Sequence, residues 1–374
     1  MGIYNDWLER QALVSVTQPL SQNVDSNDSH YSSEEGDEKL GWRHFRRRLQ
    51  FAWSGQQKYL RDRMDPNWKR GLWVYKGIPQ LGDALMDLAP RSLLQEQGLC
   101  IDLYTDTHLA LMFSGDPWLA QVYDDPRKIG KQNYDFVIVP SHKHRSLRHK
   151  SRWLPNAQWV SMHGFYTGPE FHRGKFATQR LIDLLGHNLT EQEFARHQQQ
   201  KLGLLLAPER DPERVIRIAF ALGGVDASRT YDHWLAVAEA LLHSDKSIEF
   251  TLLGSSNASG VAQALMNSLA ATGKVINQVN KTDIAQCHRL IHAHDLLVAA
   301  DGGLMHLGAT TGVKLVSLFH AGVNPRWRLS GCHLQSALQS ETMKVNDIAA
   351  HAIVDTCLEI LRPIRPLPAA GIHG

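Results

Sequence analysis

The chain has 374 residues, of which 43% are hydrophobic and 21% charged, so it is long enough for two hydrophobic cores rather than one. Its four cysteines lie far apart without a C-x-x-C pair, which argues against a zinc site or a disulfide framework and fits a reducing cytosol. No stretch approaches the roughly 18 apolar residues that span a bilayer, and no export signal opens the chain, so we expect any membrane contact to be peripheral.

Residues 1–40 are predicted to form a disordered acidic leader, because residues 21–38 are too polar to bury surface. A basic amphipathic helix is expected next, over residues 42–53. Its apolar face carries Trp42, Phe45, Leu49 and Ala52, and its basic residues are Arg43, Arg46, Arg47 and Arg48. Such a helix either lies on an anionic membrane surface or packs on the first domain with its arginines in water, and both interpretations stay open.

From Gly71 onward, short β-rich runs alternate with longer helical ones, which is typical of a parallel sheet wound with helices. The first domain is expected to contain strands at Leu72–Lys76, Cys100–Tyr104, Phe136–Pro140 and Trp159–Met162, and a helix over Asp83–Gln97. The second is expected to contain strands at Ile216–Ala221, Ile248–Leu253, Lys274–Asn277, Leu296–Ala299 and Lys314–Leu318. The proline-containing segment Lys201–Arg214 is predicted to link them, and Val345–Leu361 is predicted to be helical. The predicted divisions are therefore 41–205, 206–340 and 341–374.

Two of these strands end in glycine pairs that indicate anion binding. Gly223 and Gly224 close one strand, and Asp301 stands before Gly302 and Gly303 at the end of another. Glycine lets the backbone approach a ligand, and the amides that open a helix point toward an anion with the helix dipole behind them. We expect a phosphate or diphosphate there. The alternative is a tight strand-to-helix turn without a ligand.

Four segments carry a family resemblance in their order along the chain. They are LWVYK at 72–76 followed by LGDAL at 81–85, IAFALGG at 218–224, FTLLG at 250–254, and DGGLMHLGATTGVKLVSLF at 301–319. Together they resemble family-9 glycosyltransferases, the bacterial heptosyltransferases of lipopolysaccharide assembly. The resemblance implies an α/β fold of the GT-B type, with two Rossmann-like domains facing a central cleft and an N-terminal extension. It also implies that a helix within 341–374 returns to the N-terminal domain before the tail.

The resemblance assigns roles to individual residues. It makes Asp83 the catalytic base and suggests that Asp301 holds sugar hydroxyls, which is also physically sensible because a carboxylate would repel phosphate. Together with the glycine pairs, the residues expected at the donor are Gly223, Gly224, Ser228, Arg229, Asp301, Gly302, Gly303 and His306. Each assignment has a structural alternative: Asp83 could simply favour a helix N-terminus, and His306 could be an ordinary helix residue. The segment after Arg229 is about two residues shorter than in the better-known members, which weakens that assignment.

A dense basic run, Ser141–Arg152, follows one strand of the first domain. Lys143, Arg145 and Arg148 are candidates to attract an acidic glycolipid or saccharide acceptor. The run could instead be a solvated helix face. The run has no interleaved aromatic residues, which argues against nucleic-acid binding. The neighbouring cations disfavour metal binding through its histidines.

The sequence therefore predicts an inverting, metal-independent glycosyltransferase without a cofactor. It would move a heptose or related sugar from a nucleotide diphosphate donor, with ADP-heptose favoured by resemblance, to a lipopolysaccharide core or other saccharide of the bacterial cell envelope. The expected location is the cytoplasm, and contact to the inner membrane through residues 42–53 is one of the two interpretations of that helix. The alternative is a non-catalytic protein of the same fold that binds nucleotide sugars or saccharides. A Rossmann-type oxidoreductase is disfavoured, because neither first strand leads into G-x-G-x-x-G.

Overall fold

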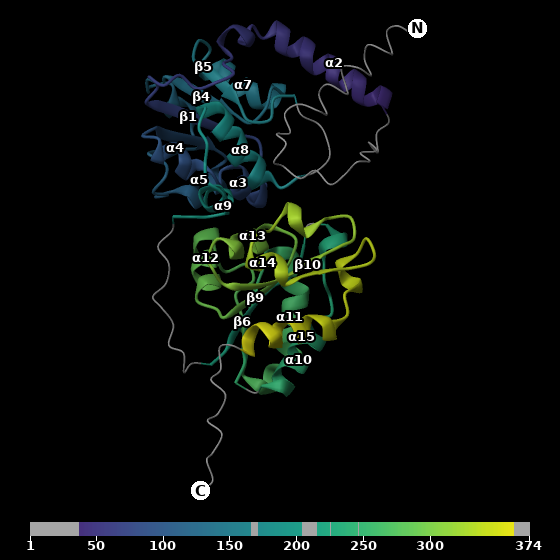
Figure 1. The fold of residues 1–374 in the computed structure, drawn as a ribbon. Coiled ribbons are helices and arrows are strands. Elements are labelled where there is room, and N and C mark those ends of the chain that lie inside the picture. The colour runs from purple at the N-terminus through teal and green to yellow at the C-terminus, as the bar shows by residue number, and fades with distance from the viewer. Residues whose placement is uncertain (1–36, 166–170, 204–214, 225, 246, 363–374) are drawn as a thin grey trace. The chain divides into compact units, whose positions relative to one another are not determined.

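The computed structural model describes residues 37–165, 171–203, 215–224, 226–245 and 247–362 (Figure 1). The chain divides into two compact units, Met1–Leu204 and Leu205–Gly374, next to the domain boundary predicted between residues 205 and 206. The predicted leader lies almost entirely outside the described residues, and so does most of the predicted linker.

Unit 1 is built on a five-stranded parallel sheet with the order β3-β2-β1-β4-β5. Its strands are β1 (Arg70–Tyr75), β2 (Cys100–Thr105), β3 (Gln121–Tyr123), β4 (Phe136–Val139) and β5 (Gln158–Ser161). The central strands are buried on both faces, which explains their continuous apolar sequences. Strand β3 was not predicted, because it has three residues and lies at the edge of the sheet, where its side chains are only partly buried.

The helices of unit 1 are α2 (Asp37–Trp53), α3 (Leu81–Asp87), α4 (Arg91–Glu96), α5 (Thr107–Phe113), α6 (Pro126–Ile129), α7 (His144–Trp153), α8 (Arg173–Leu185) and α9 (Glu191–Gln198). The prediction of one helix over Asp83–Gln97 is wrong, since the chain forms α3 and α4 with a break between them. Pro90 explains the break, because it has no N–H to donate and disfavours a helical conformation at the preceding residue.

Unit 2 contains a six-stranded parallel sheet with the order β11-β10-β9-β6-β7-β8. Its strands are β6 (Arg217–Ala221), β7 (Glu249–Leu253), β8 (Val275–Asn277), β9 (Leu296–Ala300), β10 (Lys314–Phe319) and β11 (Ala337–Gln339). All nine strands predicted for the two domains are present, with each end within two residues of the prediction. The short edge strand β11 was not predicted.

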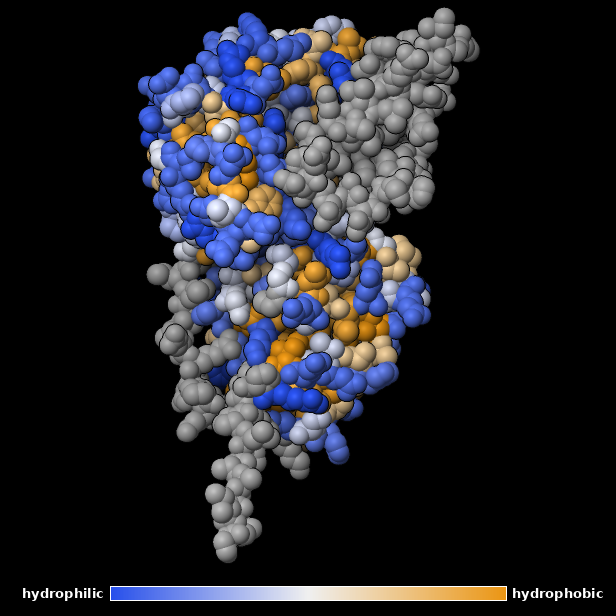
Figure 2. Space-filling view, viewed as in Figure 1, coloured by the Kyte–Doolittle hydropathy of each residue, from blue (hydrophilic) through white to orange (hydrophobic). Residues whose placement is uncertain are grey.

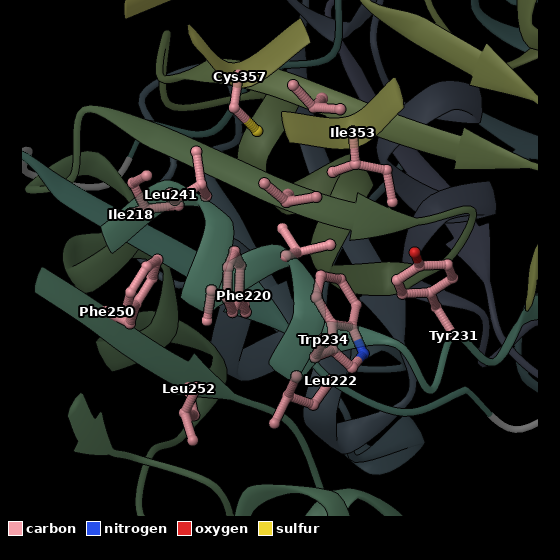
Figure 3. Close-up of a cluster of buried hydrophobic side chains, with 14 of the residues drawn as sticks. Ile218, Phe220, Leu222, Tyr231, Trp234, Leu241, Phe250, Leu252, Ile353 and Cys357 are labelled. Carbon is pink, nitrogen blue, oxygen red and sulfur yellow. The ribbon is translucent and has the colours of Figure 1, made fainter. Parts of the chain in front are cut away.

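The helices of unit 2 are α10 (Trp234–Ser244), α11 (Ser259–Ser268), α12 (Ile284–His292), α13 (Gly303–Ala309), α14 (Cys332–Gln335) and α15 (Ala350–Leu361). Figure 3 shows the core that joins some of them to the sheet, with the ring centroid of Phe220 5.0 Å from that of Trp234 and 4.9 Å from that of Phe250. Ile353 and Cys357 bring α15 into the same core.

Helix α15 packs on α10 and β10 and buries Ile353, Val354, Cys357 and Leu361 in the core of unit 2. Its apolar face therefore contributes to the cover of this sheet. The return of a helix within residues 341–374 to the N-terminal domain stays a prediction. Across the described residues, we find no helix with the length and apolar character that a membrane span requires.

Candidate functional site

In each sheet, the strands that come first in the chain are added on one side of the first strand, and later strands are added on its other side. In unit 1, β1 lies between β2 and β4, and in unit 2, β6 lies between β7 and β9. Ligands of open parallel sheets bind at such a switch point, beyond the carboxyl ends of the strands. The loops at the two switch points contain most of the predicted site residues, with Asp83 and Lys143 in unit 1 and Gly223 and Asp301 in unit 2.

Asp83 lies in the first turn of α3, in the segment that follows β1. Its side chain is 34% exposed, and its Oδ2 atom is 3.6 Å from Nη1 of Arg173, the first residue of α8. Arg173 was not predicted as a site residue, because no pattern in the sequence connects it with a position so far away along the chain. The candidate base therefore faces a cation from another helix.

A second aspartate fixes the position of Arg173. Nε and Nη2 of Arg173 donate to the two carboxylate oxygens of Asp87 at 2.9 and 2.5 Å, and the Tyr75 hydroxyl donates to Asp87 at 2.8 Å. Burial by itself would raise the pKa of Asp87, but the charge of Arg173 and the hydrogen bond from His163 outweigh it and lower the pKa below its usual value. Asp87 thus stays ionised and holds the guanidinium group beside Asp83.

The basic run of the sequence forms the N-cap and body of α7. Burial, followed by the charges of Arg47 and Arg145, lowers the pKa of Lys143 to about 8. Arg173 and Arg43 also act on Lys143, so cations from α2, α7 and α8 converge at this place. Arg145 lies close to the loop after β1, since a Cβ added to Gly77 would be 3.5 Å from its Cδ. Arg148 is exposed one turn further along α7.

Two residues of the run have structural roles instead. The Lys150 side chain is buried, and its Nζ donates to Gln56 and to the carbonyl of Pro155. The ring of His142 stacks on Phe51 with centroids 4.8 Å apart, and burial lowers its pKa to about 4, so it is neutral at pH 7. Among the described residues, no group of three or more His, Cys, Asp or Glu side chains is arranged to hold a metal ion.

In unit 2, the two glycines that follow β6 lie against the loop that follows β7. Gly223 has φ of +79°, and an added Cβ would approach Asn257 Oδ1 at 3.3 Å. Gly224 accepts a hydrogen bond of 2.7 Å from Asn257 Nδ2 through its carbonyl group. The Ser228 hydroxyl, a predicted donor contact, donates to Asp226 at 2.9 Å. The positive φ and the nearby Asn257 side chain therefore already favour glycine at position 223, apart from any ligand that binds there.

Asp301 lies at the end of β9 beside two arginines and a histidine from three separate places. Its side chain is 2% exposed, with Arg229 Nη1 at 3.5 Å, His306 Nε2 at 3.8 Å and Arg328 Nε at 3.8 Å. Its Oδ2 atom is buried and has no hydrogen-bond partner among the described residues. The sequence predicted three members of this cluster and missed Arg328, which belongs to no recognisable motif. The arrangement can hold a ligand that carries both hydroxyl groups and negative charge.

The backbone conformation and surroundings of Gly302 differ from those of Gly223. Gly302 has φ of 173°, which is extended backbone open to any residue, and an added Cβ would meet only the Ala300 carbonyl oxygen, at an ordinary 3.7 Å. Gly303 begins α13 directly after it. The fold itself therefore does not require glycine at position 302, which leaves the approach of a ligand as a reason for it.

Comparison with known proteins gives a family and a fold. Residues 175–349 match the family described as Glycosyltransferase family 9 (heptosyltransferase), so the predicted resemblance is confirmed, and with it the prediction of a glycosyltransferase. A search of curated proteins found no matching relative.

Solved structures match across most of the chain. The *Escherichia coli* ADP-heptose lps heptosyltransferase II is 17% identical, with 79% of this chain and 99% of that chain covered and a TM-score of 0.58. A family-9 glycosyltransferase from *Veillonella parvula* DSM 2008 is 15% identical, with 81% and 100% covered and a TM-score of 0.60. *E. coli* heptosyltransferase WaaC with ADP-2-deoxy-2-fluoro heptose is 18% identical, with 78% and 99% covered and a TM-score of 0.55. These likenesses confirm the predicted α/β fold of the GT-B type.

Proposed function

Because residues 175–349 match the family-9 glycosyltransferases, we propose that this protein transfers a heptose from ADP-heptose to an acidic glycolipid or saccharide of the cell envelope, such as a lipopolysaccharide core. The reaction is an inverting displacement that uses neither a metal ion nor a cofactor. The cysteine spacing fits a reaction in the cytoplasm. The observation that carries the proposal is the buried carboxylate of Asp301 within its cluster of cations.

The donor occupies the switch point of unit 2. A sugar hydroxyl donates to Asp301 Oδ2, a buried atom for which the described part of the chain offers no hydrogen-bond partner. The guanidinium groups of Arg229 and Arg328 neutralise the diphosphate, and they supply the positive charge that a divalent ion gives in other transferases. The open space beside Gly302 lets the diphosphate come close to the backbone.

The acceptor occupies the switch point of unit 1. Asp83 is partly exposed, so an acceptor hydroxyl can reach its carboxylate and pass its proton to it. Lys143, Arg145 and Arg148 attract the phosphates of an acidic acceptor, and Arg173 keeps the Asp83 carboxylate in place. The oxygen that loses its proton then attacks the anomeric carbon from the side opposite the diphosphate. The bond from that carbon to the diphosphate oxygen breaks, ADP leaves with the electron pair, and the configuration of the carbon is inverted.

Two matched amide variants test these assignments. Asp83→Asn is expected to lower transfer of labelled heptose to deep-rough lipopolysaccharide by about 10²–10⁴-fold, while a thermal shift with ADP-heptose is retained. Asp301→Asn is expected to abolish that thermal shift, because the amide can no longer hold the hydroxyl and the cations as the carboxylate does. Unchanged turnover in Asp83→Asn would reject Asp83 as the base. Donor binding by the wild type without any product would favour the non-catalytic alternative.

A further inference from the structure

Helix α2 contacts unit 1 through one particular face. The Phe51 ring stacks on His142 at 4.8 Å and meets Trp159 and Phe165 edge-on at 6.0 and 5.4 Å. Arg48, on the adjoining face, lies 5.0 Å from the Phe165 ring centroid. Phe51 also packs against the hydrophobic core of the unit. The side of α2 that carries Phe51 is therefore the side that is anchored.

The apolar stripe of α2 lies on the opposite side. At 100° per residue, Trp42, Leu49 and Trp53 lie 160–180° around the helix from Phe51. Trp42 is 48% exposed and Trp53 is 78% exposed, which makes them two of the few large hydrophobic side chains exposed in the described residues. One interpretation of the sequence had α2 pack on the first domain with its arginines in water. The structure bears out the packing of α2 on unit 1, through Phe51 rather than through the Trp42 stripe, and it places Arg48 against the unit rather than in water.

Basic side chains flank this stripe. Arg46 is exposed on α2 and lies beside Trp53 on the helical wheel, about 20° further around the helix at 100° per residue. Along α7, His144, Arg148 and Arg152 are exposed at intervals of four residues, so they form one row. A groove of about 290 Å³ runs between the two helices, with Phe51 and Leu147 in its lining and the row of α7 along its edge. Figure 2 shows orange and blue atoms side by side in the α2 region.

We propose that α2 and the basic row of α7 together dock this protein on an anionic phospholipid bilayer. The indole rings of Trp42 and Trp53 lie at the level of the headgroups, and Arg46 and Arg152 meet lipid phosphates. Tryptophan favours this boundary because its ring is apolar and its N–H is polar. Arginine adds a long apolar stem and a charge that anionic lipids attract.

The row of α7 shares Arg148 with the proposed acceptor site, whereas Arg46, Arg152, Trp42 and Trp53 have no part in the proposed sugar transfer, so their contact with lipid can be tested without nucleotide or saccharide. The full chain is sedimented with vesicles of phosphatidylcholine alone or of phosphatidylcholine mixed with phosphatidylglycerol. We expect binding to the mixed vesicles and its loss at high salt, because exposed charges are screened. Equal binding to the neutral vesicles would overturn the proposal.

Two pairs of variants identify the contact residues. Arg46→Gln/Arg152→Gln should lower partitioning by about thirtyfold, since each basic residue near an anionic leaflet adds roughly fivefold. Lys281→Gln/Arg289→Gln, which removes the same charge from exposed residues of unit 2, should leave it unchanged. Trp42→Ser/Trp53→Ser should lower partitioning to the vesicles on the order of tenfold. This is the effect expected when about 55 Å² of apolar surface is no longer removed from water on binding. Leu111→Ser/Met343→Ser is the matched control, because these side chains are 69% and 61% exposed.

The depth of insertion gives an independent readout. Phospholipids brominated near the headgroup should quench part of the tryptophan fluorescence, and Trp53→Phe should remove part of that quenching. Equal loss of binding in a test variant and its control would overturn the assignment to α2 and α7. Binding that appears only when an acidic glycolipid acceptor is added to the vesicles would also overturn it, since the groove would then be an acceptor site.

Discussion

Replacing Asp87 with asparagine should destabilise unit 1 by about 3 kcal/mol. The substitution keeps the size of the side chain but leaves Arg173 without the carboxylate that now binds it through two nitrogens, at 2.9 and 2.5 Å. Removing one partner from a buried ion pair costs about 3–5 kcal/mol. Arg173 is 28% exposed, so water can solvate part of the stranded charge, which favours the lower end of that range.

A double-mutant cycle separates the pair from its surroundings. Arg173→Met should also cost about 3 kcal/mol or more, because the Asp87 side chain is only 5% exposed and keeps its charge. The variant with both substitutions buries no isolated charge, so its loss should be smaller than the sum of the two by about 2–3 kcal/mol. Urea unfolding measures the total, and hydrogen exchange in peptides from β1 reports unit 1 by itself. Additive losses, or a loss below about 1 kcal/mol for Asp87→Asn, would refute the reasoning.

Three further predictions concern pH and backbone space. Because the folded pKa of Asp87 is lowered, its contribution to stability is present above about pH 4 and is lost as the pH falls further; urea titrations of Asp87→Asn should show a flatter acid limb. Lys143, with a pKa of about 8, should lose its charge as the pH rises, so KM for an acidic acceptor should rise from about pH 8; a similar rise in Lys143→Arg, which stays charged, would contradict this. Gly254→Ala should destabilise unit 2 by about 1–3 kcal/mol in thermal unfolding, since the added Cβ would lie 2.7 Å from the Leu222 carbonyl oxygen; Gly260→Ala in α11 has open space and should be neutral or stabilising.

The strands were predictable because each is a short apolar run with clear ends. Buried parallel strands such as β1 and β9 need apolar residues on both faces, and glycine or charged residues stop them. The helix over Asp83–Gln97 was predicted too long, because its apolar spacing continued past Pro90 and was given more weight than the missing N–H of that proline. Periodicity therefore located the elements, and local backbone chemistry decided where they end.

The site was predictable only where strand ends determine it. Asp83 and Asp301 follow strands of parallel sheets, so their approximate location is evident from the sequence. Arg173 and Arg328 belong to the same clusters, but they come from distant loops and helices whose approach depends on the packing of the whole unit. The same limit applies to α2, whose apolar stripe was identified while the side that packs was not, because Phe51 is a single residue outside the stripe.

The two aspartates have similar partners, and their exposure explains why they suit different tasks. Each lies beside arginine at the switch point of a parallel sheet, but the side chain of Asp83 is 34% exposed and that of Asp301 is 2% exposed. A base must reach a substrate hydroxyl and hold the proton it accepts, which requires an accessible carboxylate with its partner at a distance such as the 3.6 Å of Arg173. A carboxylate buried beside Arg229 and Arg328 is costly to neutralise, because the two guanidinium groups would then lack their counter-charge. Asp301 is therefore suited to hold a donor, and Asp83 to accept the proton.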